Sequence, residues 1–183
     1  MFKGNINKRF GRKANREYNC AMKKLILVCG PAAIGKSTWS EGYKTSHPDE
    51  KVEIITADEV RKEMYGSYRS FPPNNNMLLV YDEMIDRADR LCKENESVTV
   101  IFDTTMLYDE RRLYFRRHLN NFDFYALYLL KVTDYEVCIK RNHQRDKDKW
   151  VPEEVIRDMA KSYQDPSQDC IAHFDEYKSI FID

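Results

Sequence analysis

The sequence has no net formal charge and no long apolar run, and we expect no secretory leader. Its 183 residues carry 30 basic and 30 acidic side chains, which disfavours a uniformly basic nucleic-acid-binding protein. Strictly apolar runs such as Leu25–Cys29 and Tyr125–Leu130 are far too short to cross a bilayer. No apolar N-terminal stretch of signal-peptide length is seen. We therefore expect no membrane partner.

Paired cysteines are also lacking. The five cysteines are scattered along the chain without a CxxC pair, and the four histidines show no metal-ligand spacing. An odd, dispersed set of thiols is typical of reduced proteins rather than of a disulfide framework or a zinc site. The cysteine pattern therefore predicts a cytoplasmic location.

Charge is unevenly distributed along the chain. Residues 1–24 hold eight basic side chains and one acidic one, so the rest of the chain is net acidic. We interpret residues 1–21 as a basic, flexible N-terminal arm and residues 22–183 as one domain. Two interpretations of the arm stay open. It is a solubilising tail, or an early translation start with Met22 opening the domain; alternatively, its Lys and Arg contact nucleic-acid phosphates.

The apolar pattern of the domain indicates an α/β fold. Short, continuous apolar runs alternate with segments of helical periodicity, which is typical of a parallel sheet covered by helices on both faces. We expect a three-layer architecture without internal repeats. Strands are predicted at 24–29, 52–56, 97–102, 124–132 and 177–182, and helices at 36–45, 59–65 with Asp58 as N-cap, 77–94, 110–119, 134–145 and 152–163.

A phosphate-binding motif follows the first predicted strand. Residues 30–37 read GPAAIGKS and match GxxxxGK followed by Ser or Thr, between a strand and a helix. Such a loop turns backbone N–H groups and a helix N-terminus toward phosphate oxygens. Lys36 is the expected cation for the β- and γ-phosphates, and the Ser37 hydroxyl the expected Mg²⁺ ligand. The predicted ATP-binding residues of this motif are Gly30, Ala32, Ala33, Ile34, Gly35, Lys36, Ser37 and Thr38.

Two further elements carry acidic side chains toward the same edge of the predicted sheet. Asp103 ends a buried strand, where its carboxylate can help hold Mg²⁺, orient an arginine, or only cap the next turn. Asp58 and Arg61 lie three residues apart on one helix face. A carboxylate there can take the proton of an acceptor hydroxyl while the arginine positions the transferred group. An N-cap with a local ion pair explains the same spacing.

A basic cluster precedes the last predicted helix. Arg141 and Arg145 are four residues apart, and arginines at this position can close over a triphosphate and stabilise the transferring phosphoryl group. A solvated basic helix face is the alternative.

In combination, these elements resemble a known family. The segments GPAAIGKSTW, TADEVR, FDTTMLYDERR, IKRNHQR and WVPEEVIRDMAKSY are similar to the kinase domain of phage polynucleotide 5′-hydroxyl kinase and its P-loop relatives, over residues 22–164. The resemblance implies a five-stranded parallel sheet with a helical lid at about residues 140–152. It also implies that the enzyme uses ATP and Mg²⁺.

The resemblance further implies roles for individual residues. Asp58 is the general base, Arg61 an acceptor-phosphate contact, and Arg145 the lid arginine on the transferred phosphate. Asp103 supports the metal or Arg61, and Arg141 and Val151 flank the adenine. Catalysis is thus assigned to Asp58, Arg61, Lys36 and Arg145, and the metal to Ser37 and Asp103.

The leading hypothesis is an ATP- and Mg²⁺-dependent kinase acting on the 5′-hydroxyl of a DNA or RNA end. A kinase for a nucleotide sugar, an antibiotic or a metabolite is the second hypothesis, as in zeta-toxin-like relatives. A non-catalytic ATP-binding module is the third. The sequence does not indicate DNA or RNA preference, oligomeric state, or a partner ligase or phosphatase.

Overall fold

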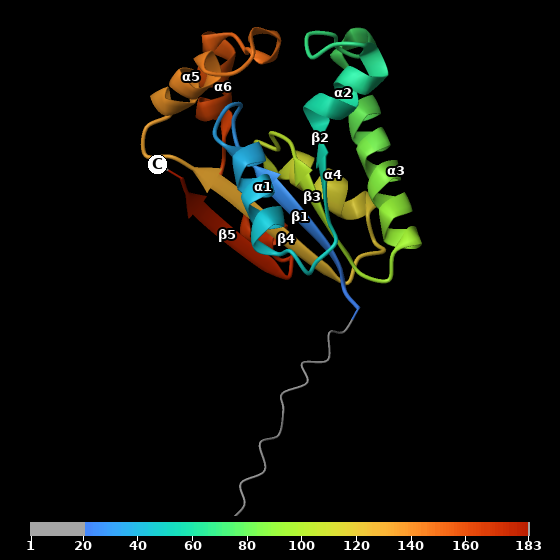
Figure 1. Cartoon of the computed structure of the whole chain (residues 1–183). Helices are drawn as coiled ribbons and strands as arrows, with labels where there is room; N and C mark the ends of the chain where they lie inside the picture. The colour runs from blue at the N-terminus through green and yellow to red at the C-terminus, as the bar shows by residue number, and fades with distance from the viewer. Residues whose placement is uncertain (1–20, 183) are drawn as a thin grey trace, which may run out of the picture.

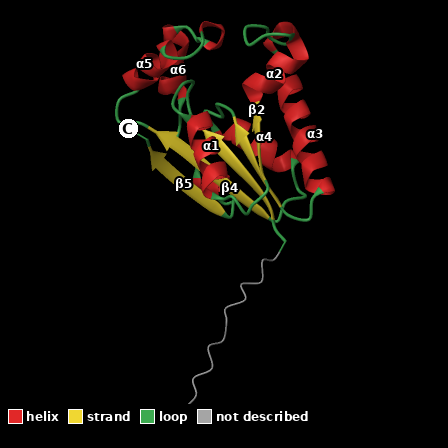
Figure 2. Cartoon of the chain, in the orientation of Figure 1, coloured by secondary structure: helices red, strands yellow, loops and turns green. Residues whose placement is uncertain are grey.

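The architecture is a central parallel sheet with helices packed on both faces (Figures 1 and 2). The computed structural model describes residues 21–182. Residues 1–20, most of the predicted basic arm, lie outside the described residues. Among the described residues, no helix is both long and apolar enough to span a membrane.

The strands form one five-stranded sheet in the order β2-β3-β1-β4-β5, and every neighbouring pair is parallel. β1 is central, flanked by β3 and β4, so its carboxyl end opens where the chain reverses its direction across the sheet. Ligands of such sheets bind at this point. The strands are β1 (Lys23–Cys29), β2 (Val52–Thr56), β3 (Val98–Asp103), β4 (Phe124–Lys131) and β5 (Glu176–Phe181).

The helices connect the strands and cover them. α1, α5 and α6 pack on one face, and α3, α4 and α7 on the other. α2 stands beyond the carboxyl edge. The helices are α1 (Lys36–Ser46), α2 (Ala57–Tyr65), α3 (Leu78–Glu94), α4 (Asp109–His118), α5 (Glu136–His143), α6 (Glu153–Ser162) and α7 (Gln168–Ile171), with 3-10 turns η1 (Pro73–Asn75) and η2 (Lys147–Lys149).

An apolar core lies on each face of the sheet, so both sets of alternating strand side chains are buried and the strand sequences are continuously apolar. Successive β1 side chains alternate between the two cores: Leu25 and Leu27 face the core under α3 and α4, whereas Ile26 and Val28 face the core under α1 and α5. All four are at most 2% exposed. The three-layer α/β prediction is thereby confirmed.

Helix boundaries differ from the sequence prediction at two functional positions. α2 begins at Ala57 with Thr56 as N-cap, so Asp58 lies in the first turn and the N-cap interpretation is wrong. The acidic first turn of α2 is instead stabilised by the helix dipole. α5 ends at His143, so Arg145 lies beyond the helix that was expected to carry it. The short helix α7 escaped prediction, because four residues carry no measurable periodicity.

Candidate active site

The phosphate loop has the conformation that anion binding requires. Between β1 and α1, Gly30, Ala33 and Gly35 have φ values of 154°, 57° and 119°. Such left-handed residues turn successive backbone N–H groups to one side and form a concave anion site. The N–H of Gly30 bonds to the Thr105 carbonyl at 3.0 Å, which fixes the loop to the segment after β3.

Lys36 lies across this loop. Its Nζ donates to the Gly30 and Pro31 carbonyls at 3.0 and 2.9 Å, and the residue is only 8% exposed. A cation held by the loop's own carbonyls is preorganised beside the N–H groups, so the loop presents positive potential on one side.

A hydroxyl and a carboxylate meet beside the lysine. Ser37 Oγ donates to Asp103 Oδ2 at 2.6 Å, and Asp103 is 4% exposed at the end of β3. Burial raises the pKa of Asp103, while the charge of Lys36 and the Ser37 hydrogen bond lower it in part. The charges of Asp58 and Arg145 also act on this carboxyl group. Four predicted site residues therefore act electrostatically on the Asp103 carboxyl group: Lys36, Ser37, Asp58 and Arg145.

The Asp58–Arg61 pair lies in the first half of α2. Arg61 Nη2 lies 3.0 Å from Asp58 Oδ1 and also donates to the Tyr68 carbonyl at 2.8 Å. Its guanidinium covers the Phe71 ring with 4.6 Å to the ring centroid. The Arg61 side chain is 11% exposed and its Nε is buried without a hydrogen-bond partner. Asp58 is half exposed, so its carboxylate remains open to a bound molecule.

We call residues 140–152 the lid. Within it, Asn142 is 1% exposed and exchanges two hydrogen bonds with the backbone of Val151, of 2.9 and 3.1 Å. Arg141 donates to the Ile34 carbonyl at 2.8 Å and to the Ile182 carbonyl at 3.0 Å. Arg141 therefore links the lid to the phosphate loop and to the residue that follows β5, a contact the sequence did not predict.

A single cleft of about 1260 Å³ collects these groups. Of the predicted site residues, only Gly30 and Ile34 do not line it: Gly30 is buried and Ile34 belongs to the core. The predicted residues along the cleft are Ala32, Ala33, Gly35, Lys36, Ser37, Thr38, Asp58, Arg61, Asp103, Arg141, Arg145 and Val151.

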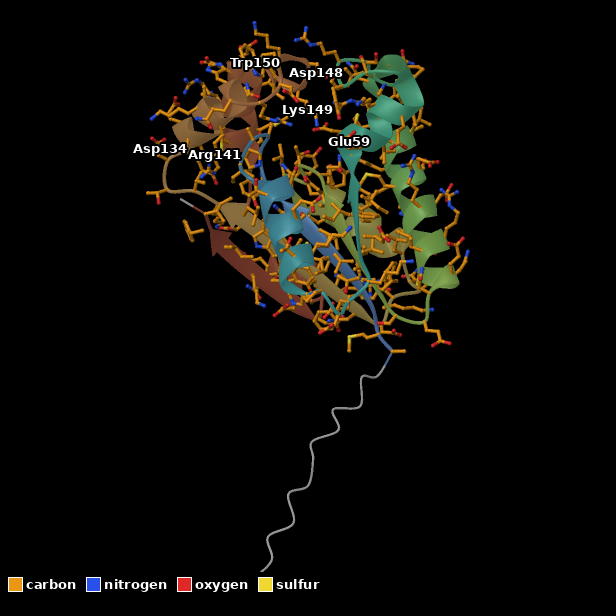
Figure 3. The ribbon with its side chains drawn as sticks, viewed as in Figure 1. Glu59, Asp134, Arg141, Asp148, Lys149 and Trp150 are labelled. Carbon is orange, nitrogen blue, oxygen red and sulfur yellow. The ribbon has the colours of Figure 1, made fainter. Side chains whose placement is uncertain are left out.

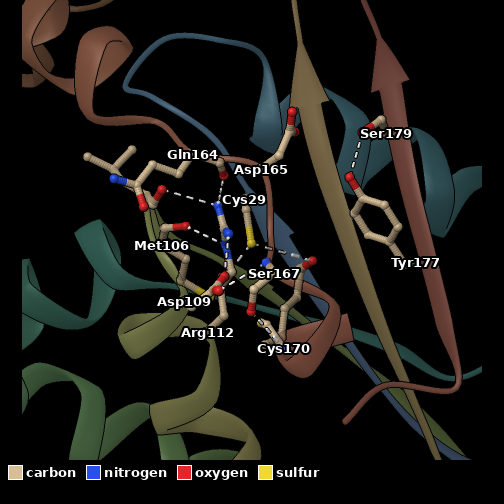
Figure 4. A network of polar contacts seen from close by, with 12 residues as sticks. Cys29, Met106, Asp109, Arg112, Gln164, Asp165, Ser167, Cys170, Tyr177 and Ser179 are labelled. Carbon is tan, nitrogen blue, oxygen red and sulfur yellow. Dashed lines mark hydrogen bonds and ion pairs between the residues drawn. The ribbon is translucent and has the colours of Figure 1, made fainter. Parts of the chain in front are cut away.

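A buried arginine behind the cleft was missed by sequence reasoning (Figure 4). Arg112 is fully buried and donates to the carbonyls of Met106, Leu107 and Gln164 and to Asp109 Oδ1, over 2.5–3.1 Å. Met106 has a φ of 40°, unusual for a side chain of this size. Arg112 thus holds a strained turn that directly follows Thr104 and Thr105 of the cleft. Helical spacing with the buried Phe115 and Leu119 is the signal that marks Arg112 as inward-facing.

Comparison with known proteins now identifies the family. The sequence model of a family described as an AAA domain matches residues 25–166, most of the chain. The chain belongs to this family. Its match begins at β1 and ends beyond α6, so it includes the phosphate loop, the Asp58–Arg61 pair and the lid.

Solved structures share the fold at low sequence identity. A chain of the Pnkp1/Rnl/Hen1 RNA repair complex aligns with a TM-score of 0.65 and 15% identity, over 87% of this chain and 48% of that one. Kti12 from Chaetomium thermophilum, in complex with ADP-AlF3, gives 0.64 and 12%, over 87% and 89%. A gluconokinase from Sinorhizobium meliloti 1021 gives 0.58 and 15%, over 88% and 83%. The chain therefore shares the α/β, P-loop kinase-like fold of these structures.

Proposed function

We propose that the protein catalyses ATP- and Mg²⁺-dependent phosphoryl transfer to the 5′-hydroxyl of a polynucleotide. The observation that carries the proposal is the convergence in one cleft of a phosphate loop, a hydroxyl–carboxylate pair and the Asp58–Arg61 pair. Binding a triphosphate does not require a carboxylate–guanidinium pair in the same cleft, whereas activating and positioning an acceptor hydroxyl does.

The residues of the phosphate loop fit ATP. The backbone N–H groups of the loop and the Lys36 ammonium would hold the β- and γ-phosphates. Arg145 of the lid, which interacts electrostatically with Asp103, would neutralise negative charge on the transferred phosphoryl group.

The donor set also fits Mg²⁺. The Ser37 hydroxyl and the buried Asp103 carboxylate are hard oxygen ligands, and Mg²⁺ is commonly held by one or two protein oxygens together with phosphates and water. Within residues 21–182, no cluster of three acidic, His or Cys side chains forms a separate metal site. Bound Mg²⁺ would neutralise charge on the phosphate oxygens.

The transfer is a single in-line displacement. The acceptor hydroxyl oxygen attacks the γ-phosphorus while its proton passes to the Asp58 carboxylate. The bond from the γ-phosphorus to the bridging oxygen breaks, and ADP leaves. Asp58 is half exposed, so its carboxylate is accessible to the acceptor hydroxyl whose proton it takes. The 3.0 Å ion pair with Arg61 positions this carboxylate.

Support for a nucleic-acid acceptor comes from the wall of the cleft and from the resemblance in sequence. Phe71 is 53% exposed although it lies in the cleft, and one face of its ring is covered by Arg61. An open aromatic ring beside the acceptor pair suits a nucleobase better than a polar sugar acid. Similarity to a chain of an RNA repair complex agrees with this acceptor, and similarity to a gluconokinase keeps a small-molecule acceptor as the competing hypothesis.

The test is transfer of label from γ-labelled ATP to a 5′-hydroxyl oligonucleotide, offered as DNA and as RNA. We expect label on the 5′ end, with Lys36→Ala and Asp58→Ala each lowering kcat/KM by at least about 10²-fold. Asp58→Glu keeps the carboxylate and is the matched control, with partial activity.

Other outcomes decide between the competing functions. Transfer only to a metabolite pool, in a manner that depends on Asp58, would assign the acceptor to a small molecule. ATP binding without transfer to oligonucleotide or metabolite would identify a binding module. Full activity of Asp58→Ala would remove Asp58 from the mechanism.

A further inference from the structure

The lid and the α2 side of the cleft are joined by a three-residue contact at its mouth (Figure 3). Lys149 Nζ of the lid lies 3.2 Å from Glu59 Oε1 of α2 and 4.4 Å from the centroid of the Tyr68 ring. The Tyr68 hydroxyl donates to the same Glu59 oxygen at 2.5 Å. We call Glu59, Tyr68 and Lys149 the clasp.

A second contact runs parallel to the clasp. Arg69 Nη2 donates to the Lys147 carbonyl at 2.6 Å, so two consecutive residues of the loop after α2 contact η2 of the lid. We call residues 66–71 the acceptor loop. Lid and acceptor loop are 78 residues apart in sequence at this bond.

Tyr68 also reaches the reaction centre. Its carbonyl accepts from Arg61 Nη2 at 2.8 Å, while its ring and hydroxyl hold Lys149 and Glu59. Tyr68 is 9% exposed, so its place is fixed by packing. One residue therefore contacts the lid cation with its side chain and the acceptor-side arginine with its backbone.

The clasp joins an acidic and a basic side chain, and Lys62 of α2 adds a second cation 4.5 Å from the centroid of the Tyr68 ring. Partial burial raises the pKa of Glu59, but the hydrogen bonds from Tyr68 and Lys149 outweigh it and hold the pKa below its usual value. Hydrogen bonds to Tyr68 and Glu59 raise the pKa of Lys149. Both partners are thus charged across the neutral range.

We propose that Glu59, Tyr68 and Lys149 are positioning residues that couple the lid to Arg61, so that placement of the lid over the nucleotide and placement of the acceptor-side arginine depend on one another. The coupling to the acceptor rests on the proposed function; the mechanical link between lid and acceptor loop does not. A two-sided contact of this kind makes the coupling reciprocal.

The first experiment needs no acceptor and uses the full-length chain. Amide hydrogen exchange of residues 66–71 is measured by mass spectrometry in wild type, Lys149→Met and Glu59→Gln. Both variants lose the ion pair, and Lys149→Met also loses the cation–π contact, so exchange should accelerate about three- to tenfold in each. Lys149→Arg, which keeps the charge and stacks on an aromatic ring, should restore protection. Lys140→Met removes an exposed lid cation and should change nothing.

The second experiment asks whether the clasp acts through Arg61. Lys149→Met should raise the KM for the acceptor oligonucleotide about three- to tenfold with a smaller change in kcat. In an Arg61→Ala background the same substitution should have no further effect, because its route to the acceptor is already lost.

The outcomes separate this inference from the proposed function. Unchanged exchange in Lys149→Met and Glu59→Gln overturns the clasp, whatever the enzyme phosphorylates. Accelerated exchange in a protein that phosphorylates no oligonucleotide supports the mechanical link and rejects the polynucleotide acceptor. Additive effects of Lys149→Met and Arg61→Ala overturn the coupling to Arg61.

Discussion

Ser37 Oγ lies 2.6 Å from Asp103 Oδ2, and this hydrogen bond joins the start of α1 to the carboxyl end of β3. The two residues are 66 positions apart in sequence. They meet because β1 and β3 are hydrogen-bonded neighbours, in the register that pairs Val28 with Asp103. The sheet topology therefore creates the oxygen pair at the phosphate loop.

Asp103→Asn tests the role of this pair in metal binding. The amide keeps an oxygen that accepts from Ser37 but removes the negative charge. We expect the apparent Mg²⁺ affinity or the activity to fall about 10- to 100-fold, measured as kinase rate against Mg²⁺ concentration. The free energy of unfolding in urea should not fall, because the buried charge is costly without its metal. Wild-type Mg²⁺ dependence in the variant would exclude Asp103 as a ligand.

The pH dependence of Asp103 gives a second prediction. As the pH falls, the contribution of Asp103 to the free energy of unfolding and the affinity for Mg²⁺ should change in opposite directions. Burial raises its pKa, so the folded chain binds this proton at a higher pH than the unfolded chain does. The Asp103 contribution to the free energy of unfolding therefore increases as the pH falls from the raised pKa toward the ordinary value of about 3.9. Over the same range Mg²⁺ affinity should decrease, because the metal requires the carboxylate.

The difference between wild type and Asp103→Asn isolates both trends. Urea unfolding and Mg²⁺ titration are each measured across the acidic range. The wild-type minus variant difference should change with pH in opposite directions in the two measurements. A difference that stays flat in both would show that Asp103 titrates outside this range.

Local sequence patterns encoded the parts of the site that need only neighbouring residues. Gly30–Ser37 was predicted as a phosphate loop because strand, turn and helix follow one another directly. Asp58 and Arg61 pair at i,i+3, so one helical turn suffices. The continuous apolar runs predicted the parallel sheet. Each of these features depends on spacings of a few residues.

Residues that act across the fold escaped prediction. Arg112 bonds to Gln164 over 52 positions, and Lys149 pairs with Glu59 over 90. No sequence periodicity relates such partners. Likewise, nothing in the sequence around Tyr68 indicates that its backbone carbonyl accepts a hydrogen bond from Arg61. Arg141 is predicted beside the adenine, and no local pattern indicates that its guanidinium also donates to two backbone carbonyls. Only the sheet order brings these segments together.

Arg112 gives a stability prediction. Arg112→Met removes four hydrogen bonds to buried or half-buried acceptors, including Asp109, and should lower the free energy of unfolding by about 3–5 kcal/mol. Arg112→Lys keeps the charge but cannot present a planar fork, so it should recover only part of the loss. Arg111→Met, at the half-buried neighbour, is the matched control. Equal urea midpoints for Arg111→Met and Arg112→Met would contradict the role of Arg112.

Backbone conformation in the phosphate loop gives the last prediction. Ala33 has a φ of 57°, which costs a side-chain-bearing residue about 1–2 kcal/mol, so Ala33→Gly should preserve or raise the thermal midpoint. Gly35 has a φ of 119°, and a Cβ there would lie 3.1 Å from Ile182 Cδ1. Gly35→Ala should therefore lower stability by about 1–3 kcal/mol. It should also weaken binding of a non-hydrolysable ATP analogue, because the loop must shift.

The control for these two substitutions is Gly42, in the helix α1 that follows the phosphate loop. Gly42 is inside α1 with nothing within 4 Å of a Cβ, so Gly42→Ala should stabilise the protein by about 0.5–1 kcal/mol and leave nucleotide affinity unchanged. Differential scanning calorimetry and isothermal titration with the analogue measure both effects. If Gly35→Ala behaved like Gly42→Ala, the left-handed turn would have no part in holding the triphosphate, and the anion site would depend on Lys36 and the start of α1 alone.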